Sequence, residues 1–211
     1  MTGVQTCALP IYKFNSGLGQ TWAVDIAFGG STAITGLVCD SSNNVYAMSA
    51  QIGGNSYVVK LDSSGAVQWS IKLTDIYSEG SKTLGIDSSN NIYILGAGSS
   101  VNEVLLIKIN SSGTVQWQRK ITIGSSLNIS MRGGIVVDST NQVLYATFLR
   151  YGDYASVVLK LPLDGSKTGT YSLNGYNMVY AASSYTIASA SITRTVGTFN
   201  TGTFSYTQGA E

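Results

Sequence analysis

The stretch IKINSSGTVQW at residues 107–117 has two near-copies in the chain, VKLDSSGAVQW at 59–69 and YKFNSGLGQTW at 12–22. Self-similarity at a regular spacing indicates a repeat architecture, in which every copy forms one structural unit. In each copy a lysine precedes a tryptophan by nine residues: Lys13 and Trp22, Lys60 and Trp69, and Lys108 and Trp117. The step from Lys60 to Lys108 is 48 residues, which sets the size of the unit.

A second motif alternates with the first, as CDSSNNVYAM, IDSSNNIYIL and VDSTNQVLYA, with its aspartates at Asp40, Asp87 and Asp138. The step from Asp40 to Asp87 is 47 residues, and the step from Asp87 to Asp138 is 51. The third copy has drifted further. VLKLPLDG aligns Lys160 with the earlier lysines, and Gly169 falls where a tryptophan is expected.

The two motifs divide each repeat into four short strands joined by tight turns. Asp-Ser-Ser-Gly is typical of a turn whose glycine takes positive φ, and in DSSNN an asparagine can do the same while the aspartate caps the turn. NIYILGA, EVLLIKI and SVVLKL are nearly continuous apolar runs, which predicts strands buried on both faces. Since no helical pattern accompanies them, we expect four-stranded sheets packed radially. A β-sandwich would instead show alternation with one polar face.

These motifs resemble the bacterial and phage β-propeller repeat known as SBBP, and more distantly they are similar to NHL-type and PQQ-like propeller repeats. The resemblance lies in the Asp before NNIY, the Lys-Ile-Asn strand and the Trp after the Ser-Ser-Gly turn, and it covers about 12–172. It implies an all-β fold, a β-propeller fragment of about three four-stranded blades plus one strand, with a short β-rich C-terminal extension.

The repeats also predict boundaries. We expect a partial blade at 12–28 and blades at about 30–75, 80–123 and 130–172. Before them, MTGVQTCALPI at 1–11 resembles the translation of a sequencing adaptor, so we expect an artefact joined to a truncated gene. After them, 173–211 is rich in Ser, Thr and Tyr and is expected to be a β extension or linker, with GTFNTGTFSYT as a hairpin.

Composition narrows the possible chemistry. The chain has 12 Lys and Arg against 11 Asp and Glu, without the basic clusters that nucleic-acid binding or a polybasic membrane anchor needs. No apolar run approaches the roughly 20 residues of a membrane span. The absence of histidine removes Ser-His and Cys-His dyads and the commonest zinc ligand. Cys39 is expected to be a small buried side chain on a strand, and no cofactor or metal is expected.

The acidic and aromatic residues suggest four kinds of site, and in each case a structural role is favoured. A tight Ca²⁺ site wants several carboxylates on one ion, so Asp40, Asp87 and Asp138 are expected to cap turns. DSSGAVQW lacks the Asp-x-Gly-x-x-Trp spacing of a sialidase Asp-box. The three tryptophans are expected to pack between blades rather than to belong to a PQQ-dependent dehydrogenase. Asp75 and Glu79 are the only close pair of non-repeat acids that a glycosidase or lyase could use, and a solvated loop is expected there.

The expected function is a non-enzymatic structural or recognition module of a phage tail or virion, which presents rim loops to a glycan or protein, including other virion subunits. The predicted contact residues are Tyr77, Glu79, Arg132, Tyr151 and Asp153. One alternative is a secreted or cell-surface bacterial propeller. Another is a fragment of a PQQ-like oxidoreductase or polysaccharide lyase whose active residues lie in further blades, since the fold alone does not decide function.

Overall fold

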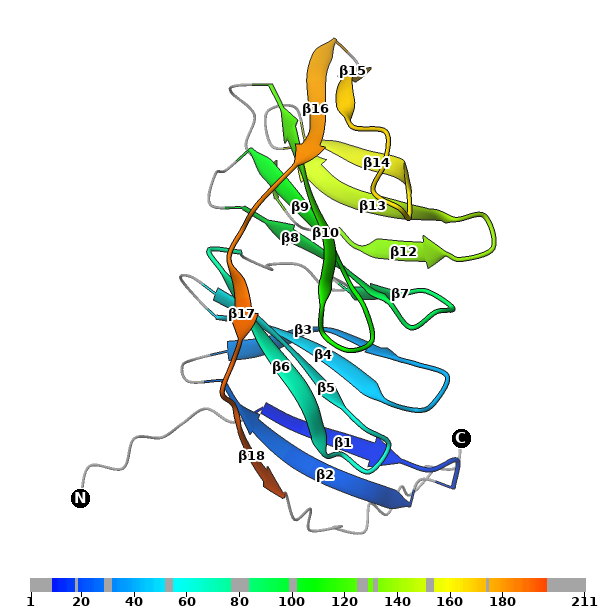
Figure 1. Ribbon diagram of the computed structural model, residues 1–211, viewed down its shortest axis with the longest axis vertical. Helices are drawn as coiled ribbons and strands as arrows, with labels where there is room; N and C mark the ends of the chain where they lie inside the picture. Colours follow the sequence, from blue (N-terminus) through cyan, green and yellow to red (C-terminus); the bar gives the residue numbers. More distant parts are fainter. Residues whose placement is uncertain are drawn as a thin grey trace, which may run out of the picture.

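The computed structural model describes residues 9–17, 19–28, 32–51, 55–76, 84–98, 102–124, 129–130, 133–150, 154–173 and 175–196. Within these ranges every regular element is a β-strand, and all strand pairs are antiparallel (Figure 1). The strands are β1 (Leu9–Phe14), β2 (Gln20–Ala27), β3 (Thr32–Cys39), β4 (Val45–Gln51), β5 (Asn55–Leu61), β6 (Val67–Thr74), β7 (Leu84–Ile86), β8 (Ile92–Ala97), β9 (Glu103–Ile109), β10 (Val115–Ile123), β11 (Ile129–Ser130), β12 (Ile135–Asp138), β13 (Val143–Arg150), β14 (Ala155–Pro162), β15 (Gly169–Leu173), β16 (Tyr176–Ala182), β17 (Ile187–Ser189) and β18 (Thr193–Val196). The described part of the chain contains no helix that is long and apolar enough to cross a membrane.

The strands form four sheets that follow one another along the chain and stack face to face (Figure 1). The first sheet has the order β1-β2-β18, the second β17-β6-β5-β4-β3 and the third β15-β16-β10-β9-β8-β7. In the fourth sheet β13 lies between β14 and an interrupted strand made of β11 and β12. The first and fourth sheets lie at opposite ends of the stack, and the described sheets do not close into a ring.

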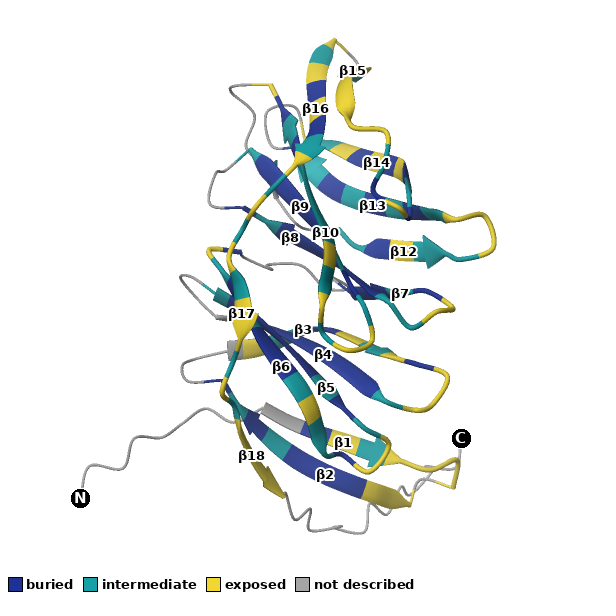
Figure 2. Cartoon of the chain, in the orientation of Figure 1, coloured by how far each residue is buried: buried dark blue, intermediate teal, exposed yellow. Residues whose placement is uncertain are grey.

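Three apolar cores fill the three junctions between sheets. In β8, Ile92 and Ile94 belong to the core between the second and third sheets, whereas Tyr93 and Leu95 belong to the core between the third and fourth. All four side chains are buried, and β9 is buried along almost its whole length (Figure 2). The prediction that NIYILGA and EVLLIKI are covered on both faces is therefore confirmed.

Two expectations about burial are wrong, one on the outer face of the last sheet and one on an edge strand. Burial alternates along SVVLKL in β14, where Val158 is 65% exposed, because no described sheet packs on the outer face of the fourth sheet. Cys39 is exposed rather than buried. It shares a face of β3 with Leu37, which is 51% exposed, and β3 is the edge strand of the second sheet.

The first sheet contains two repeat strands, whereas the sequence predicts one. The Asn15 side chain accepts hydrogen bonds from the N–H groups of Gly17 and Gly19, so NSGLG forms a turn that divides YKFNSGLGQTW into two strands. β1 begins at Leu9, inside the segment 1–11, and pairs with β2. Ile11 is buried in the core between the first and second sheets.

The last repeat lacks its fourth strand. The predicted blade at 130–172 would include β15, but β15 pairs with β16, and β16 pairs with β10 of the third sheet. Gly169 at the start of β15 stands where the other repeats have a tryptophan. This strand therefore lacks the tryptophan that packs on the next sheet in the other repeats.

We call residues 176–196 the C-terminal strap. Its strands β16, β17 and β18 pair with β10, β6 and β2, the last repeat strands of the third, second and first sheets. Figure 1 shows the strap running down one side of the stack. The hairpin predicted around 200–202 lies outside the described residues.

Each tryptophan ties its own sheet to the next one through a hydrogen bond. The indole Nε1 donates to a turn carbonyl of the following sheet: Trp22 to Ser63 at 2.9 Å, Trp69 to Ser111 at 3.0 Å and Trp117 to Leu163 at 3.2 Å. An N–H that packs at a junction needs such a partner, because an unpaired donor out of water is costly. The same contact therefore recurs at all three junctions.

The indole rings also lie against the turn glycines Gly65, Gly113 and Gly165, which all have positive φ. A Cβ on Gly165 would lie only 2.9 Å from Cδ2 of Trp117. Glycine thus serves two purposes in these turns. It takes the left-handed conformation without strain, and it leaves room for the ring.

We expect Gly165→Ala to lower the free energy of unfolding by about 2–5 kcal/mol, because alanine must hold positive φ, which costs about 1–2 kcal/mol, and its Cβ meets the Trp117 ring, which adds about 1–3 kcal/mol. Gly175→Ala is the matched control: Gly175 has φ +84°, but a Cβ there meets nothing within 4 Å. The control should lose only about 1–2 kcal/mol. Urea unfolding followed by tryptophan fluorescence measures both losses, and equal losses would show that the ring makes no steric demand.

Candidate functional site

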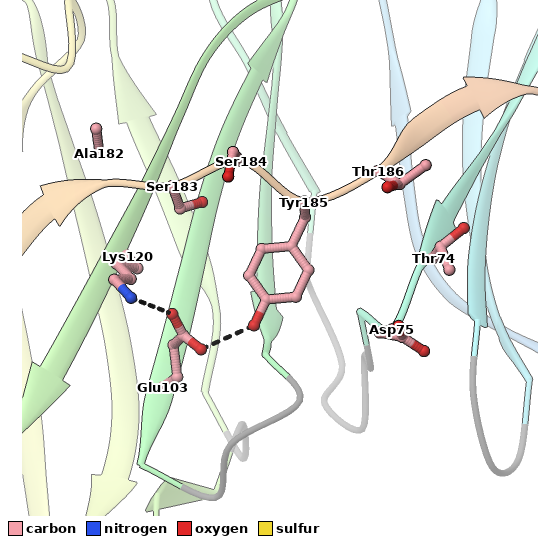
Figure 3. A pocket seen from close by; sticks show the side chains of 9 residues that line it. All are labelled: Thr74, Asp75, Glu103, Lys120, Ala182, Ser183, Ser184, Tyr185 and Thr186. Atoms are coloured by element: carbon pink, nitrogen blue, oxygen red, sulfur yellow. Dashed lines mark hydrogen bonds and ion pairs between the residues drawn. The ribbon is translucent and has the colours of Figure 1, made fainter.

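A polar pocket of about 410 Å³ opens where the strap passes from the third sheet to the second (Figure 3). The second sheet supplies one side, β9 and β10 supply the other, and residues 182–186 of the strap cross it. The lining residues are Thr74, Asp75, Glu103, Lys120, Ala182, Ser183, Ser184, Tyr185 and Thr186.

Glu103, the first residue of β9, is the buried charge of this pocket. Its side chain is only 8% exposed, and its Oε1 lies 3.4 Å from Nζ of Lys120. Its Oε2 accepts a 2.8 Å hydrogen bond from the Tyr185 hydroxyl. A Cβ on Gly98 would lie 2.6 Å from Oε2, so this glycine makes room for the carboxylate. A carboxylate removed from water is tolerated only with such partners.

Tyr185 is held in place by the side chain of Gln118. The Gln118 Nε2 donates to the Tyr185 carbonyl at 3.0 Å, and its Oε1 accepts the Tyr185 N–H at 2.9 Å. A side-chain amide thus satisfies both backbone groups of a residue that lies between two strands of the strap. The phenol is thereby directed at Glu103.

The pocket can exchange hydrogen bonds with a polar ligand. Asp75 and Glu103 bring carboxylates to it, and hydroxyl-bearing strap residues lie between them (Figure 3). The Glu103 carboxylate is engaged by Lys120 and Tyr185, so it acts here as an acceptor that fastens the strap. Among the described residues, no group of three His, Cys, Asp or Glu side chains lies close enough to hold a metal ion.

The five predicted contact residues, Tyr77, Glu79, Arg132, Tyr151 and Asp153, all lie outside the described residues. Of the predicted acidic pair, Asp75 lines the pocket, whereas Glu79 again falls outside the described ranges. The structure therefore brings one member of the pair to a pocket wall.

The repeat aspartates accept hydrogen bonds from their own turns. Oδ1 of Asp87 accepts the backbone N–H groups of Ser89 and Asn91 at 2.9 Å, and Oδ2 accepts the Asn91 amide at 2.8 Å and the Tyr93 hydroxyl at 2.9 Å. Asp40 makes the same set of contacts in the preceding repeat. These oxygens cap the turn and bond to a core tyrosine.

The hydrogen bonds in these turns shift the pKa values of the aspartate and of the tyrosine that donates to it. Burial opposes ionisation of Asp87, but the hydrogen bonds from Asn91, Tyr93 and Ser89 outweigh it and hold the pKa of this carboxyl below its usual value. Burial, together with the Asp87 charge and its hydrogen bond, raises the pKa of the Tyr93 phenol. At neutral pH the pair is therefore a carboxylate and a neutral phenol.

The third copy of the turn is one residue longer. Asp138 accepts from the N–H and the side chain of Asn141, at 3.0 and 2.7 Å. These bonds, with a smaller contribution from Lys160, lower the pKa of Asp138. Leu144 then stands six residues after Asp138, where the other copies have tyrosine, and it is fully buried. The insertion thus replaces the buried hydroxyl with an apolar side chain.

The repeat lysines face their tryptophans across hairpins, as Lys13 and Trp22, Lys60 and Trp69, and Lys108 and Trp117. Nζ of Lys60 donates to the Ser111 carbonyl at 3.0 Å and lies 5.1 Å from the centre of the Tyr46 ring. Lys108 lies over Tyr93 in the same way, at 5.2 Å. Lys13 donates to Ser63 at 3.4 Å, whereas Lys160 is exposed on β14.

Sequence reasoning missed the pocket and its key side chains, Glu103, Gln118 and Tyr185. A signal for Glu103 existed, because an acidic residue begins the mostly apolar strand EVLLIKI. Tyr185 lies 82 residues away from Glu103, and nothing local connects the two. No protein-family model matches the chain, and none of the curated proteins compared with it is similar enough to count as a relative.

A double-mutant cycle tests the fastening of the strap. We expect Glu103→Gln and Tyr185→Phe to show a coupling free energy of about 1–3 kcal/mol, because the hydrogen bond joins a phenol to a buried charge. Thr186→Ala, at an exposed strap position, is the control and should change stability by less than about 0.5 kcal/mol. Additive losses in urea unfolding would contradict this.

Acid should weaken the fold through the turn aspartates. Because the folded-state pKa of Asp87 lies below its unfolded value, its contribution is present above about pH 4 and disappears as the pH falls through the folded-state pKa. Asp87→Asn does not titrate, so the variant should be less stable at pH 7 but should lose less stability between about pH 5 and 2. Urea midpoints across this range measure both slopes; parallel slopes would rule out the linkage.

Proposed function

We propose that the four sheets are blades of a β-propeller and that the chain is a non-enzymatic structural and recognition module. Three features support this fold. The sheets stack face to face, the second and third contribute to apolar cores on both faces, and one tryptophan contact repeats at every junction. Radially packed four-stranded sheets of this kind close into rings of four to eight blades.

The proposed role rests on one observation: the repeated polar side chains make hydrogen bonds within their own turns or to the neighbouring sheet. The aspartates bond to their own turns, and the tryptophans and Lys60 bond to the turn of the next sheet. Side chains used in this way build a rigid frame and are not available for chemistry. Recognition is therefore assigned to the connecting loops, which tolerate variation.

In the sequence, four of the predicted contact residues fall between consecutive strands, and Arg132 falls between the two parts of an interrupted strand. Tyr77 and Glu79 follow β6, Arg132 lies between β11 and β12, and Tyr151 and Asp153 join β13 to β14. The capped DSSNN and SSG turns lie at the other end of these strands. We propose that the connections at the end opposite these turns form the rim that binds a ligand.

We favour a glycan as the ligand of the rim, with a protein partner as the alternative. Tyrosine rings together with carboxylate and guanidinium groups suit the apolar faces and hydroxyls of sugars. The net charge of +1 is too small to attract a strongly charged partner electrostatically. A phage tail or virion, or a secreted or cell-surface setting, agrees with this role.

A glycan array of bacterial lipopolysaccharides and capsules tests the proposal. We expect binding to at least one glycan, and a loss of about tenfold or more when the five predicted rim residues are changed to alanine together. Ser41→Ala with Ser88→Ala, at exposed turn positions of the opposite end, is the control and should bind normally. Binding that survives the five changes would overturn the assignment of the rim, and quinone-dependent oxidation or glycan cleavage by the chain would overturn the non-enzymatic role.

A further inference from the structure

The outer face of the fourth sheet carries side chains that the other repeats bury at a junction. Val58 and Leu106 stand two residues before the repeat lysines of the second and third sheets. Both are fully buried in the core that their sheet shares with the following one. Val158 has the same position before Lys160, yet it is 65% exposed. The fourth sheet thus presents a junction position on which no described sheet packs.

The strand register leads to the same conclusion for a tyrosine. In each of the last three sheets one tyrosine lies opposite the repeat lysine: Tyr46, Tyr93 and Tyr145. The first two are fully buried at junctions, whereas Tyr145 is only partly buried. Val136, which pairs with Tyr145, is 63% exposed. The residues that build a junction are therefore present on the outer face of the fourth sheet.

The outer face of the first sheet presents the other half of a junction. Leu61 and Ile109 directly follow the repeat lysines, and both are fully buried in the core that their sheet shares with the preceding one. Phe14 follows Lys13 at the same position and is 47% exposed. The first sheet thus exposes the side that receives a preceding sheet, and the fourth exposes the side that receives a following one.

These two faces are of the kinds that pack together within the chain. Each of the three junctions joins the following side of one sheet to the preceding side of the next. The first sheet has only three described strands, and it already forms a core with the second, so three strands suffice for a junction. The two exposed faces lie at opposite ends of the stack (Figure 1). A junction between such faces therefore joins two molecules.

We propose that two copies of the chain associate head to tail, with the fourth sheet of each copy packed on the first sheet of the other. Two copies of four sheets give eight sheets, which is within the four to eight that close a ring of radially packed sheets. An interface between two different patches forms a closed ring when the rotation between the copies closes, and a filament when it does not. The assembly extends the frame and does not depend on what the rim binds.

One polar contact is expected across the new junction. Lys60 donates to the Ser111 carbonyl in the turn of the following sheet. Ser16 is the counterpart of Ser111 in the NSGLG turn, and Lys160 is the counterpart of Lys60. We expect Lys160 to donate to the carbonyl of the partner's Ser16. Because Gly169 replaces the tryptophan, this junction has no indole hydrogen bond, so the two copies should separate on dilution while each chain stays folded.

Sedimentation equilibrium of the full chain tests the association. We expect twice the mass of one chain at concentrations up to about 100 µM. Val158→Lys and Phe14→Lys should each raise the dissociation constant by about a hundredfold or more, because an ammonium group would be buried against an apolar face. Both side chains are exposed in the single chain, so both variants should fold, which circular dichroism checks. Ser189→Lys, at an exposed position of the strap on the second sheet, is the control and should associate normally.

A mixture of the two variants tests the head-to-tail arrangement. In a mixed pair, one junction carries both changes and the other carries neither, so Val158→Lys and Phe14→Lys should associate with each other more tightly than either does with itself. Pairing of two fourth sheets would leave Phe14→Lys dimeric, and pairing of two first sheets would leave Val158→Lys dimeric. Either of these results overturns the proposal.

The mass of the parent chain decides the remaining outcomes. A monomer throughout the concentration range overturns the association, and a mass that grows beyond two chains overturns the closed pair. The glycan array is read separately. A monomer that binds a glycan contradicts the association alone, and a dimer that binds no glycan contradicts the assignment of the rim alone.

Discussion

The contact between an indole and the glycine turn of the next sheet is the interaction on which the stack depends. It recurs at all three junctions, beside the apolar cores that also join neighbouring sheets, and the stability of a repeat array is the sum of its units and their interfaces. The ring covers the turn, its N–H binds a turn carbonyl, and Tyr46 and Tyr93 pack beside Trp69 and Trp117. At the fourth sheet Gly169 replaces the tryptophan, and there the last strand leaves its own repeat for the strap.

The strap adds a second set of links over the same junctions. Its strands pair with the last repeat strands of three sheets, which would otherwise present unpaired edges. Arg194 donates to the Gly65 carbonyl at 2.7 Å, as Arg119 does to Gly165 at 2.6 Å. A side chain of the strap thus reinforces the first junction in the way that a repeat side chain reinforces the third.

The frame and the proposed recognition surface use different kinds of residue. Repeated aspartates, lysines and tryptophans are engaged inside the frame, where the same geometry recurs from unit to unit. The pocket beneath the strap is a local exception, since Glu103, Lys120 and Tyr185 occur at one junction alone among the described residues. The burial of a charge at this crossing makes the position of the strap specific, because a displaced Tyr185 would leave Glu103 with one partner fewer.

The sequence by itself determined the repeat, the turns and the burial of β8 and β9 on both faces, because each depends on neighbouring residues or on a regular spacing. It could not determine which end face or which edge strand is left uncovered, and so it was wrong about Val158 and Cys39. Nor could it place the strap or its pocket, since Arg194 meets Ile26 and Tyr185 meets Glu103 across long stretches of chain. Only the tertiary structure decides such contacts, because an edge strand offers the same backbone groups to any segment, and packing selects the one that fits.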